Sequence, residues 1–217
     1  LVLAKRLSLV GVGRPVLFGT GRGTVIDVRA DGCTISDLIL DGTGVGAGNQ
    51  MDAAVRLRSN NNIVSGNEMR RVFYGVVIAG GSGNVVAGNS IEGLLDLPFG
   101  RRGDGIYVYQ GPRNHIVRNH IVGERDAIFL QYAHNVRVEY NIVERSRYGL
   151  HDMFSDDTIV RDNVFRTSLV GANVMNSKRL TLERNEFAHN RGITAVGLTL
   201  KDCDGSTVSD NRFTGNA

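Results

Sequence analysis

Short runs in which apolar residues alternate with polar or small residues follow one another along most of the chain. Early examples are Leu7-Ser8-Leu9 and Thr24-Val25-Ile26-Asp27-Val28, and glycine, proline or asparagine separates such runs. A period of two predicts half-buried strands, and no stretch shows sustained helical spacing. The pattern therefore predicts an all-β protein made of many short strands.

An asparagine followed by one residue and then an apolar residue recurs at regular intervals. The series consists of Asn67, Asn89, Asn119, Asn141, Asn163, Asn185 and Asn211. Four of its six steps are 22 residues long, and the other two are 30 and 26. A repeated period of this size indicates a repeat architecture. It is too short for a strand, a helix and a crossover, which together take about 30 residues.

The fold predicted from these two patterns is a single-stranded right-handed parallel β-helix, a solenoid with coils of about 22 residues. Stacked coils place equivalent residues about 4.8 Å apart, so inward Val, Ile and Leu form a continuous core. Asparagine suits a corner because it tolerates left-handed backbone and its amide can bond the amide of the next coil. We expect one domain over residues 1–217, with loop insertions near 42–51 and 92–102. We also expect a fragment of a longer solenoid, because the end at Ala217 shows no cap.

Charge and cysteine content narrow the function classes. The chain has 25 basic and 22 acidic residues, a balance that gives no case for nucleic acid as a partner. No apolar run approaches the roughly 20 residues that span a bilayer, so we do not expect the chain itself to cross a membrane. Cys33 and Cys203 lie about seven coils apart in the predicted fold, which excludes an internal disulfide.

Two aspartates are the first candidates for chemistry. Asp104 and Asp126 occupy equivalent positions on neighbouring coils, and several arginines share their register: Arg101, Arg102, Arg125 and Arg147. Because parallel β-helices include polysaccharide-cleaving enzymes, one interpretation is a catalytic acid pair. The other is a corner ladder whose carboxylates are neutralised by the arginines.

A histidine and two methionines form the second candidate site. Alternation points His151 and Met153 outward and Asp152 inward, and it places Met175 directly beside Met153 on the next coil. Thioether and imidazole groups suit Cu(I), so these three residues form a candidate metal site. The same face carries a candidate docking surface, whose other members are Tyr107, Tyr109, Phe129, Gln131 and Lys201. A soft apolar patch that binds a protein is the alternative interpretation, because methionine is common on such surfaces.

Three segments of the chain resemble one known family. The most specific is Arg147-Tyr148-Gly149-Leu150-His151-Asp152-Met153-Phe154-Ser155. Two strands follow it, Gly171-Ala172-Asn173-Val174-Met175-Asn176-Ser177 and Gly197-Leu198-Thr199-Leu200-Lys201-Asp202. The chain thus resembles the NosD family, the periplasmic copper-related maturation proteins of nitrous oxide reductase. Asp152 and Asn176 stand where the family pattern has aromatic residues.

The resemblance implies a non-enzymatic accessory protein of the bacterial periplasm. It implies an ABC transporter (ATPase and permease) and a copper chaperone lipoprotein as partners. The task would be copper delivery for the copper–sulfur cluster of nitrous oxide reductase, and His151, Met153 and Met175 receive the Cu(I) role because they match the motif. Two other hypotheses stay open. One is a polysaccharide lyase, hydrolase or uronate epimerase that uses Asp104 and Asp126, and the other is a scaffold that binds the reductase or the permease.

Overall fold

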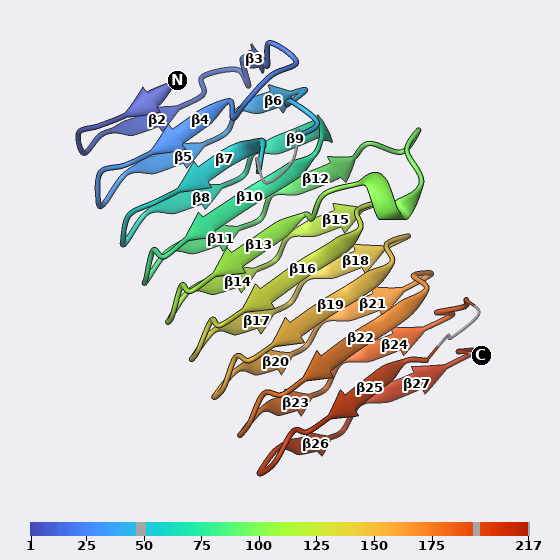
Figure 1. The fold of residues 1–217 in the computed structure, drawn as a ribbon. Helices are drawn as coiled ribbons and strands as arrows, with labels where there is room; N and C mark the ends of the chain where they lie inside the picture. Colours follow the sequence, from blue (N-terminus) through green and yellow to red (C-terminus); the bar gives the residue numbers. More distant parts are fainter. Residues whose placement is uncertain (47–50, 193–195, 217) are drawn as a thin grey trace.

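Three parallel β-sheets wind around one another in a solenoid (Figure 1). The computed structural model describes residues 1–46, 51–192 and 196–216. Each sheet has nine strands, and successive strands of the chain pass from one sheet to the next. A single 3-10 helix, η1 (Phe99–Arg101), is the only helix among the described residues. The predicted all-β parallel β-helix with coils of about 22 residues is therefore confirmed.

The three sheets are named here by their strands. Sheet A contains β1 (Val2–Leu3), β4 (Ile26–Val28), β7 (Ala53–Leu57), β10 (Tyr74–Ala79), β13 (Ile106–Tyr109), β16 (Asp126–Gln131), β19 (Tyr148–Met153), β22 (Val170–Met175) and β25 (Leu198–Lys201). Sheet B contains β2 (Ser8–Val10), β5 (Thr34–Ser36), β8 (Ile63–Ser65), β11 (Val85–Ala87), β14 (His115–Val117), β17 (Arg137–Glu139), β20 (Ile159–Arg161), β23 (Thr181–Glu183) and β26 (Thr207–Ser209). Sheet C contains β3 (Val16–Phe18), β6 (Ile39–Asp41), β9 (Glu68–Val72), β12 (Ser90–Gly93), β15 (His120–Val122), β18 (Ile142–Glu144), β21 (Val164–Arg166), β24 (Glu186–Ala188) and β27 (Arg212–Thr214).

Inward side chains of equivalent coils stack into the core. In sheet A, Ile106 pairs with Ile128, Ile128 with Leu150, and Leu150 with Ala172. All four are fully buried. Such columns run the length of the solenoid because the coils stay in register, and the burial of their apolar surface stabilises the stack.

The predicted asparagine series forms a continuous hydrogen-bonded ladder at the corner between sheets B and C. The amide of Asn141 donates to Oδ1 of Asn163 at 2.9 Å, and that oxygen also accepts the backbone N–H of Asn141 at 2.9 Å. The same pair of bonds joins the other steps from Asn67 to Asn211. The ladder is therefore confirmed.

The left-handed backbone predicted for the corner asparagines is not found at those residues. The left-handed backbone does not belong to the ladder asparagines but to the residue before each of them, as at Arg118, Tyr140, Asp162 and Arg184, whose φ angles are 52–57°. Asparagine is required here for its amide, which bridges coils and satisfies buried backbone groups.

Two further polar ladders were not predicted. Asn62, Asn84 and Asn114 stack at the corner between sheets A and B. Ser146, Ser168, Asn190 and Asn216 stack between sheets C and A. Each corner of the solenoid thus carries its own set of side chains that bond the backbone of the neighbouring coil.

The longest connection that lies entirely within the described residues falls where the sequence predicts an insertion near 92–102. Residues 94–105 join β12 to β13 and include η1, and Arg102 holds this loop by donating to the carbonyls of Leu95, Leu97 and Gly123. The insertion predicted near 42–51 includes residues 47–50, which lie outside the described residues.

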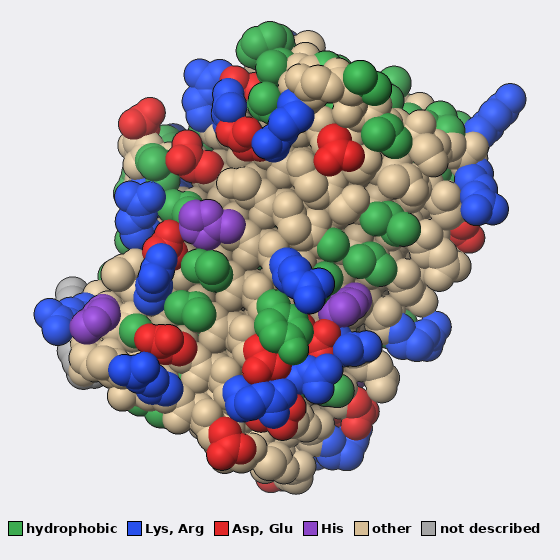
Figure 2. All heavy atoms as spheres, turned by 180° about the vertical axis from the view of Figure 1, so that it is seen from behind, with side chains coloured by type: hydrophobic (Ala, Val, Ile, Leu, Met, Phe, Trp, Pro, Cys, Tyr) green, Lys and Arg blue, Asp and Glu red, His purple; other side chains and the backbone are tan. Residues whose placement is uncertain are grey.

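The surface is charged but balanced. On the face opposite to that of Figure 1, basic and acidic side chains lie intermixed (Figure 2). Sheet B carries an ion-pair ladder in which Glu139 contacts Arg137, Arg161 and His115 at 2.7–3.0 Å. In the described part of the chain, no helix has the length and apolar character needed to cross a membrane.

Candidate functional site

The candidate site lies on the outer face of sheet A. Its central column of outward residues runs Val77, Tyr107, Phe129, His151 and Asn173, each paired with the next in register. A second column contains Tyr109, Gln131, Met153, Met175 and Lys201. The strands β16, β19 and β22 have six residues each, which leaves room for both columns side by side.

The imidazole of His151 is held in place from three sides. Its Nδ1 lies 3.0 Å from Oδ2 of Asp126. Its ring stacks on Phe129, with centroids 4.5 Å apart, and the ring of Tyr148 meets it edge-on at 5.0 Å. Only 12% of the side chain is exposed, and Nε2 has no hydrogen-bond partner among the described residues. A carboxylate on one ring nitrogen fixes the tautomer and leaves the other nitrogen available to a ligand, as in many metal-binding histidines.

Met153 and Met175 are direct neighbours in register, as the sequence predicts. Both side chains are half-buried. The amide of Asn173 donates to the sulfur of Met175 at 3.5 Å, and Asn173 is the register partner of His151. The structure thus brings all three predicted metal ligands onto one small area of two adjacent coils.

The two candidate carboxylates are each clamped by an arginine. Arg125 donates to both oxygens of Asp104 at 3.0 and 2.8 Å, and Arg147 donates to both oxygens of Asp126 at 2.9 and 2.7 Å. Both aspartates are fully buried. Burial and the nearby Asp126 charge raise the pKa of Asp104 to about 7, although Arg125 acts in the opposite direction. Arg125 directly precedes Asp126 in the sequence and its Nε lies 3.9 Å from Oδ2 of Asp126, so the two pairs form one cluster across the coils.

This geometry favours the structural interpretation of the acid pair over direct catalysis. A polymer on the surface would meet Arg125 and Arg147, which are 28% and 34% exposed, before it met either carboxylate. Asp126 nevertheless contacts His151, so the ladder orients the imidazole. The sequence did not predict this link. The two residues are 25 positions apart in the sequence, which is one coil of 22 residues plus the three positions from Asp126 to Phe129.

The predicted docking surface is only partly exposed. Tyr107 is 6% exposed because it packs between Tyr74 and Phe129, and its hydroxyl donates to Oε1 of Gln131 at 2.6 Å. Tyr109, Phe129 and Gln131 are half-buried, and Lys201 is exposed at the end of its column. Tyr74 and Tyr148 belong to the same aromatic row and were missed, because each stands at the start of its strand, outside the alternation that defined the columns.

Asp152 lies inward, as alternation predicts, between Leu130 and Val174. Only 1% of it is exposed. Its Oδ1 accepts a hydrogen bond of 2.8 Å from Ser177, whereas Oδ2 is buried without a partner among the described residues. Burial raises the pKa of Asp152 to about 7, against the hydrogen bond from Ser177.

The donor set is unusual for a metal site. Among the described residues, no three His, Cys, Asp or Glu side chains are grouped so that they could hold a metal ion. One imidazole and two thioethers do not form such a group, yet they match the preference of Cu(I) for soft ligands. The residues present therefore fit Cu(I) and do not fit a hard cation.

Solved structures with this fold include carbohydrate-active proteins. The enzymatically active domain of tailspike protein 2 from bacteriophage CBA120 matches 95% of the chain with a TM-score of 0.73 and 11% identity. DFA-IIIase from Arthrobacter chlorophenolicus A6 matches 88% (TM-score 0.63, 14% identity), and alginate lyase from Paenibacillus sp. str. FPU-7 matches 97% (TM-score 0.58, 19% identity). The chain spans 38%, 57% and 86% of those chains.

These matches show a shared fold, and they correct one prediction. The expectation that the chain is not an enzyme is wrong, because the structures that match it include an enzymatically active domain and a lyase.

Comparison at the level of sequence gives the family. No curated protein matches the chain. Residues 88–217 match the family model described as periplasmic copper-binding protein (NosD), which covers more than half of the chain and includes His151, Met153 and Met175. The chain therefore belongs to the NosD family.

Proposed function

We propose that this protein binds Cu(I) in the periplasm and passes it on for assembly of the copper–sulfur cluster of nitrous oxide reductase. The family is described as periplasmic and copper-binding, which supports the location and the cargo. The observation that carries the proposal is the orientation of His151: Asp126 binds Nδ1, Nε2 has no hydrogen-bond partner among the described residues, and Met153 and Met175 are register partners two residues further along the same two strands.

The chemistry of the three ligands suits transfer rather than storage. Two neutral thioethers and one imidazole bind Cu(I) without a proton that must be displaced from a thiol. His151 supplies a fixed nitrogen, and the flexible methionine side chains can follow the ion as it arrives or leaves. The half-buried position of the three side chains keeps the ion reachable by a second protein.

An ABC transporter, made of an ATPase and a permease, and a copper chaperone lipoprotein complete the proposed pathway. In this proposal nitrous oxide reductase docks on Tyr109, Phe129 and Gln131 beside the metal ligands, and Lys201 lies at the far end of the second column. Reductase pull-down should weaken when Phe129→Ala and Tyr109→Ala are combined. Equal capture of the double variant and the unaltered protein would reject this docking surface.

Anaerobic titration of Cu(I) against a competing chelator tests the metal site. We expect a Met153→Leu, Met175→Leu double variant to bind Cu(I) at least about tenfold more weakly, since it loses two of three soft ligands while keeping their volume. Met51→Leu, a half-buried methionine of the N-terminal coils, is the matched control. X-ray absorption should show copper–sulfur scattering in the unaltered protein and in the control. Unchanged affinity in the double variant would exclude these ligands.

A second candidate function is a carbohydrate-active enzyme, namely a polysaccharide lyase, hydrolase or uronate epimerase. It is favoured by the pKa of Asp104, which burial and Asp126 raise to about 7, where a carboxyl group can both donate and accept a proton. Incubation with uronate polymers tests it by release of unsaturated or reducing ends and by inversion at C5. Loss of any such activity in Asp104→Asn, with Asp31→Asn as a surface control, would support this function, and no product from a broad panel would reject it.

A further inference from the structure

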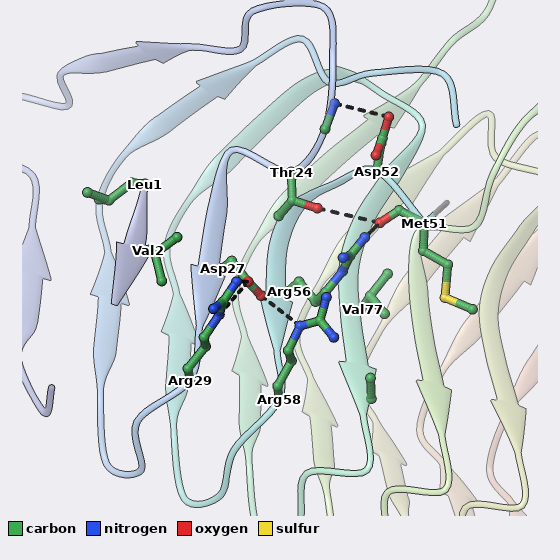
Figure 3. A pocket seen from close by; sticks show the side chains of 12 residues that line it. Leu1, Val2, Thr24, Asp27, Arg29, Met51, Asp52, Arg56, Arg58 and Val77 are labelled. Atoms are coloured by element: carbon green, nitrogen blue, oxygen red, sulfur yellow. Dashed lines mark hydrogen bonds and ion pairs between the residues drawn. The ribbon is translucent and has the colours of Figure 1, made fainter. Parts of the chain in front are cut away.

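A pocket of about 620 Å³ opens on the outer face of sheet A near its N-terminal end (Figure 3). Its volume is in the range of small-molecule sites. It lies three coils before His151 in the same outward column, because Val77 pairs with Tyr107, Tyr107 with Phe129 and Phe129 with His151. None of the residues discussed above as metal ligands or acid pair lines it.

The pocket is a consequence of residue sizes along two columns. Arg56 stands at an outward position of β7, and Arg29 and Arg58 directly follow β4 and β7, whereas the corresponding positions of β10 carry the small Val77 and Ala79. The next coil returns to large side chains with Tyr107 and Tyr109. The arginines therefore stand on one side of Val77 and Ala79 and the tyrosines on the other, and Val77 and Ala79 pack with those tyrosines in one apolar cluster.

Three arginines converge on the pocket, and only two carboxylates lie among them. Asp27 accepts from Arg29 at 2.9 Å and from Arg58 at 3.0 Å, so a single buried carboxylate is shared by two guanidinium groups. Asp52 binds loop backbone instead of an arginine, since its Oδ2 accepts hydrogen bonds from the backbone N–H groups of Gly23 and Gly46 at 3.1 and 3.3 Å. Three guanidinium groups thus face two carboxylates, so one positive charge at the pocket is not neutralised.

Arg56 is the least satisfied of the three arginines. It pairs in register with both Asp27 and Val77 and extends along the wall of the pocket (Figure 3). One Nη atom donates to the carbonyl of Met51, but Nε is buried and lacks a hydrogen-bond partner among the described residues. Burial, together with the neighbouring charge of Arg58, lowers the pKa of Arg56. A buried donor without a partner is costly, so Arg56 gains from a ligand whose binding shifts its side chain and brings Nε to an acceptor.

We propose that this pocket binds a carboxylate carried on a sugar ring, as in a uronic acid unit of an acidic oligosaccharide. A guanidinium fork matches the two oxygens of a carboxylate. The accessible apolar lining of the pocket, formed by Leu1, Val2, Met51 and Ala79, suits the flat apolar face of a pyranose ring. A bare inorganic anion would use the arginines but leave this apolar lining uncovered. The site is independent of the proposed copper ligands.

Isothermal titration calorimetry on the whole chain with trigalacturonate tests this site. Maltotriose serves as the neutral ring, and sulfate and a triglutamate peptide serve as anions without a sugar. We expect trigalacturonate to bind and the other three to bind at least about tenfold more weakly, since each lacks the charge or the ring. Arg56→Gln should weaken binding of trigalacturonate about tenfold or more. Arg212→Gln, an exposed arginine at the C-terminal end, should leave it unchanged.

A second variant separates loss of the site from loss of the fold. Ala79→Phe fills the pocket from its outward side and removes no charge, so it should abolish binding while circular dichroism and the melting temperature stay unchanged. The proposal is overturned if trigalacturonate does not bind, if Arg56→Gln and Ala79→Phe bind it normally, or if sulfate or triglutamate binds as tightly. Cu(I) affinity should be the same in both variants, which distinguishes this site from the copper proposal.

Discussion

Asp152 is an ionisable group in an apolar column, so its substitution tests how the burial of a charge affects the stability of the fold. Leu130 and Val174 are its neighbours in register, and the space around it is fully enclosed. Burial raises its pKa from the ordinary 3.8 to about 7. The folded protein therefore favours the protonated carboxyl group, whereas the unfolded chain releases the proton at a much lower pH.

The size of the effect follows from this difference. A raised pKa in the folded state contributes stability that is present below about pH 4 and is lost as the pH rises toward about 7. Each pKa unit corresponds to about 1.4 kcal/mol, so the ionisation of Asp152 removes about 4 kcal/mol in total. Between about pH 5 and about pH 8 the loss is about 3 kcal/mol. Asp152→Asn keeps the shape and an oxygen that can accept the bond from Ser177, but it cannot ionise.

Urea unfolding followed by circular dichroism at about pH 5 and about pH 8 measures the difference. We expect Asp152→Asn to be more stable than the unaltered protein at both pH values, and the gain should be about 3 kcal/mol larger at the higher pH. Subtracting the unaltered protein at each pH cancels the other titrating groups. Asp202→Asn, an exposed aspartate after β25, is the matched control. A gain that does not change with pH would refute the claim that burial of a charge at this position governs stability.

Two further changes test the ladders that hold the coils together. Asn163→Ala should cost about 3 kcal/mol or more in urea unfolding, because it leaves buried donors and acceptors of Asn141 and Asn185 without partners, whereas Ser90→Ala on the exposed side of β12 should cost little. Burial would raise the pKa of Glu139, but bonds from Arg137 and His115 lower it overall. Glu139→Gln should therefore be less stable than the unaltered protein at neutral pH in the same unfolding assay. The difference in stability should shrink as the pH falls below the ordinary 4.5 and vanish below the lowered pKa of the folded protein. A difference that persists in acid would contradict a stabilising role of these ion pairs.

The architecture could be predicted because each coil of a solenoid repeats the same sequence pattern. Asn119, Asn141, Asn163 and Asn185 give the same coil length of 22 residues in three successive steps, and the alternation in each coil assigns inward and outward positions. Met153 and Met175 could be placed side by side for the same reason, since register follows directly from the period. The period and the alternation are enough to predict contacts that join equivalent positions on neighbouring coils.

Other features depend on contacts between positions that are not equivalent. The bond joins His151 in an outward column to Asp126, a buried carboxylate at the start of β16, so the period did not predict it. The pocket beside Arg56 depends on the sizes of residues on three successive coils, and its empty space has no signature in alternation. The corner ladders through Asn84 and Ser168 were missed because their positions mix asparagine, serine and apolar residues.

The concentration of candidate chemistry on sheet A has a geometric cause. Strands of sheet B have three residues each and those of sheet C mostly so, and their outward positions are largely occupied by ion pairs such as Glu139 with Arg161 and Glu144 with Arg166. Strands β16, β19 and β22 have six, so two outward columns lie side by side over several coils. A ligand that needs donors from two coils and two columns at once can find them there. The proposed copper site at His151 and the proposed sugar site at Arg56 lie on this same face without overlapping, because the period separates them by whole coils.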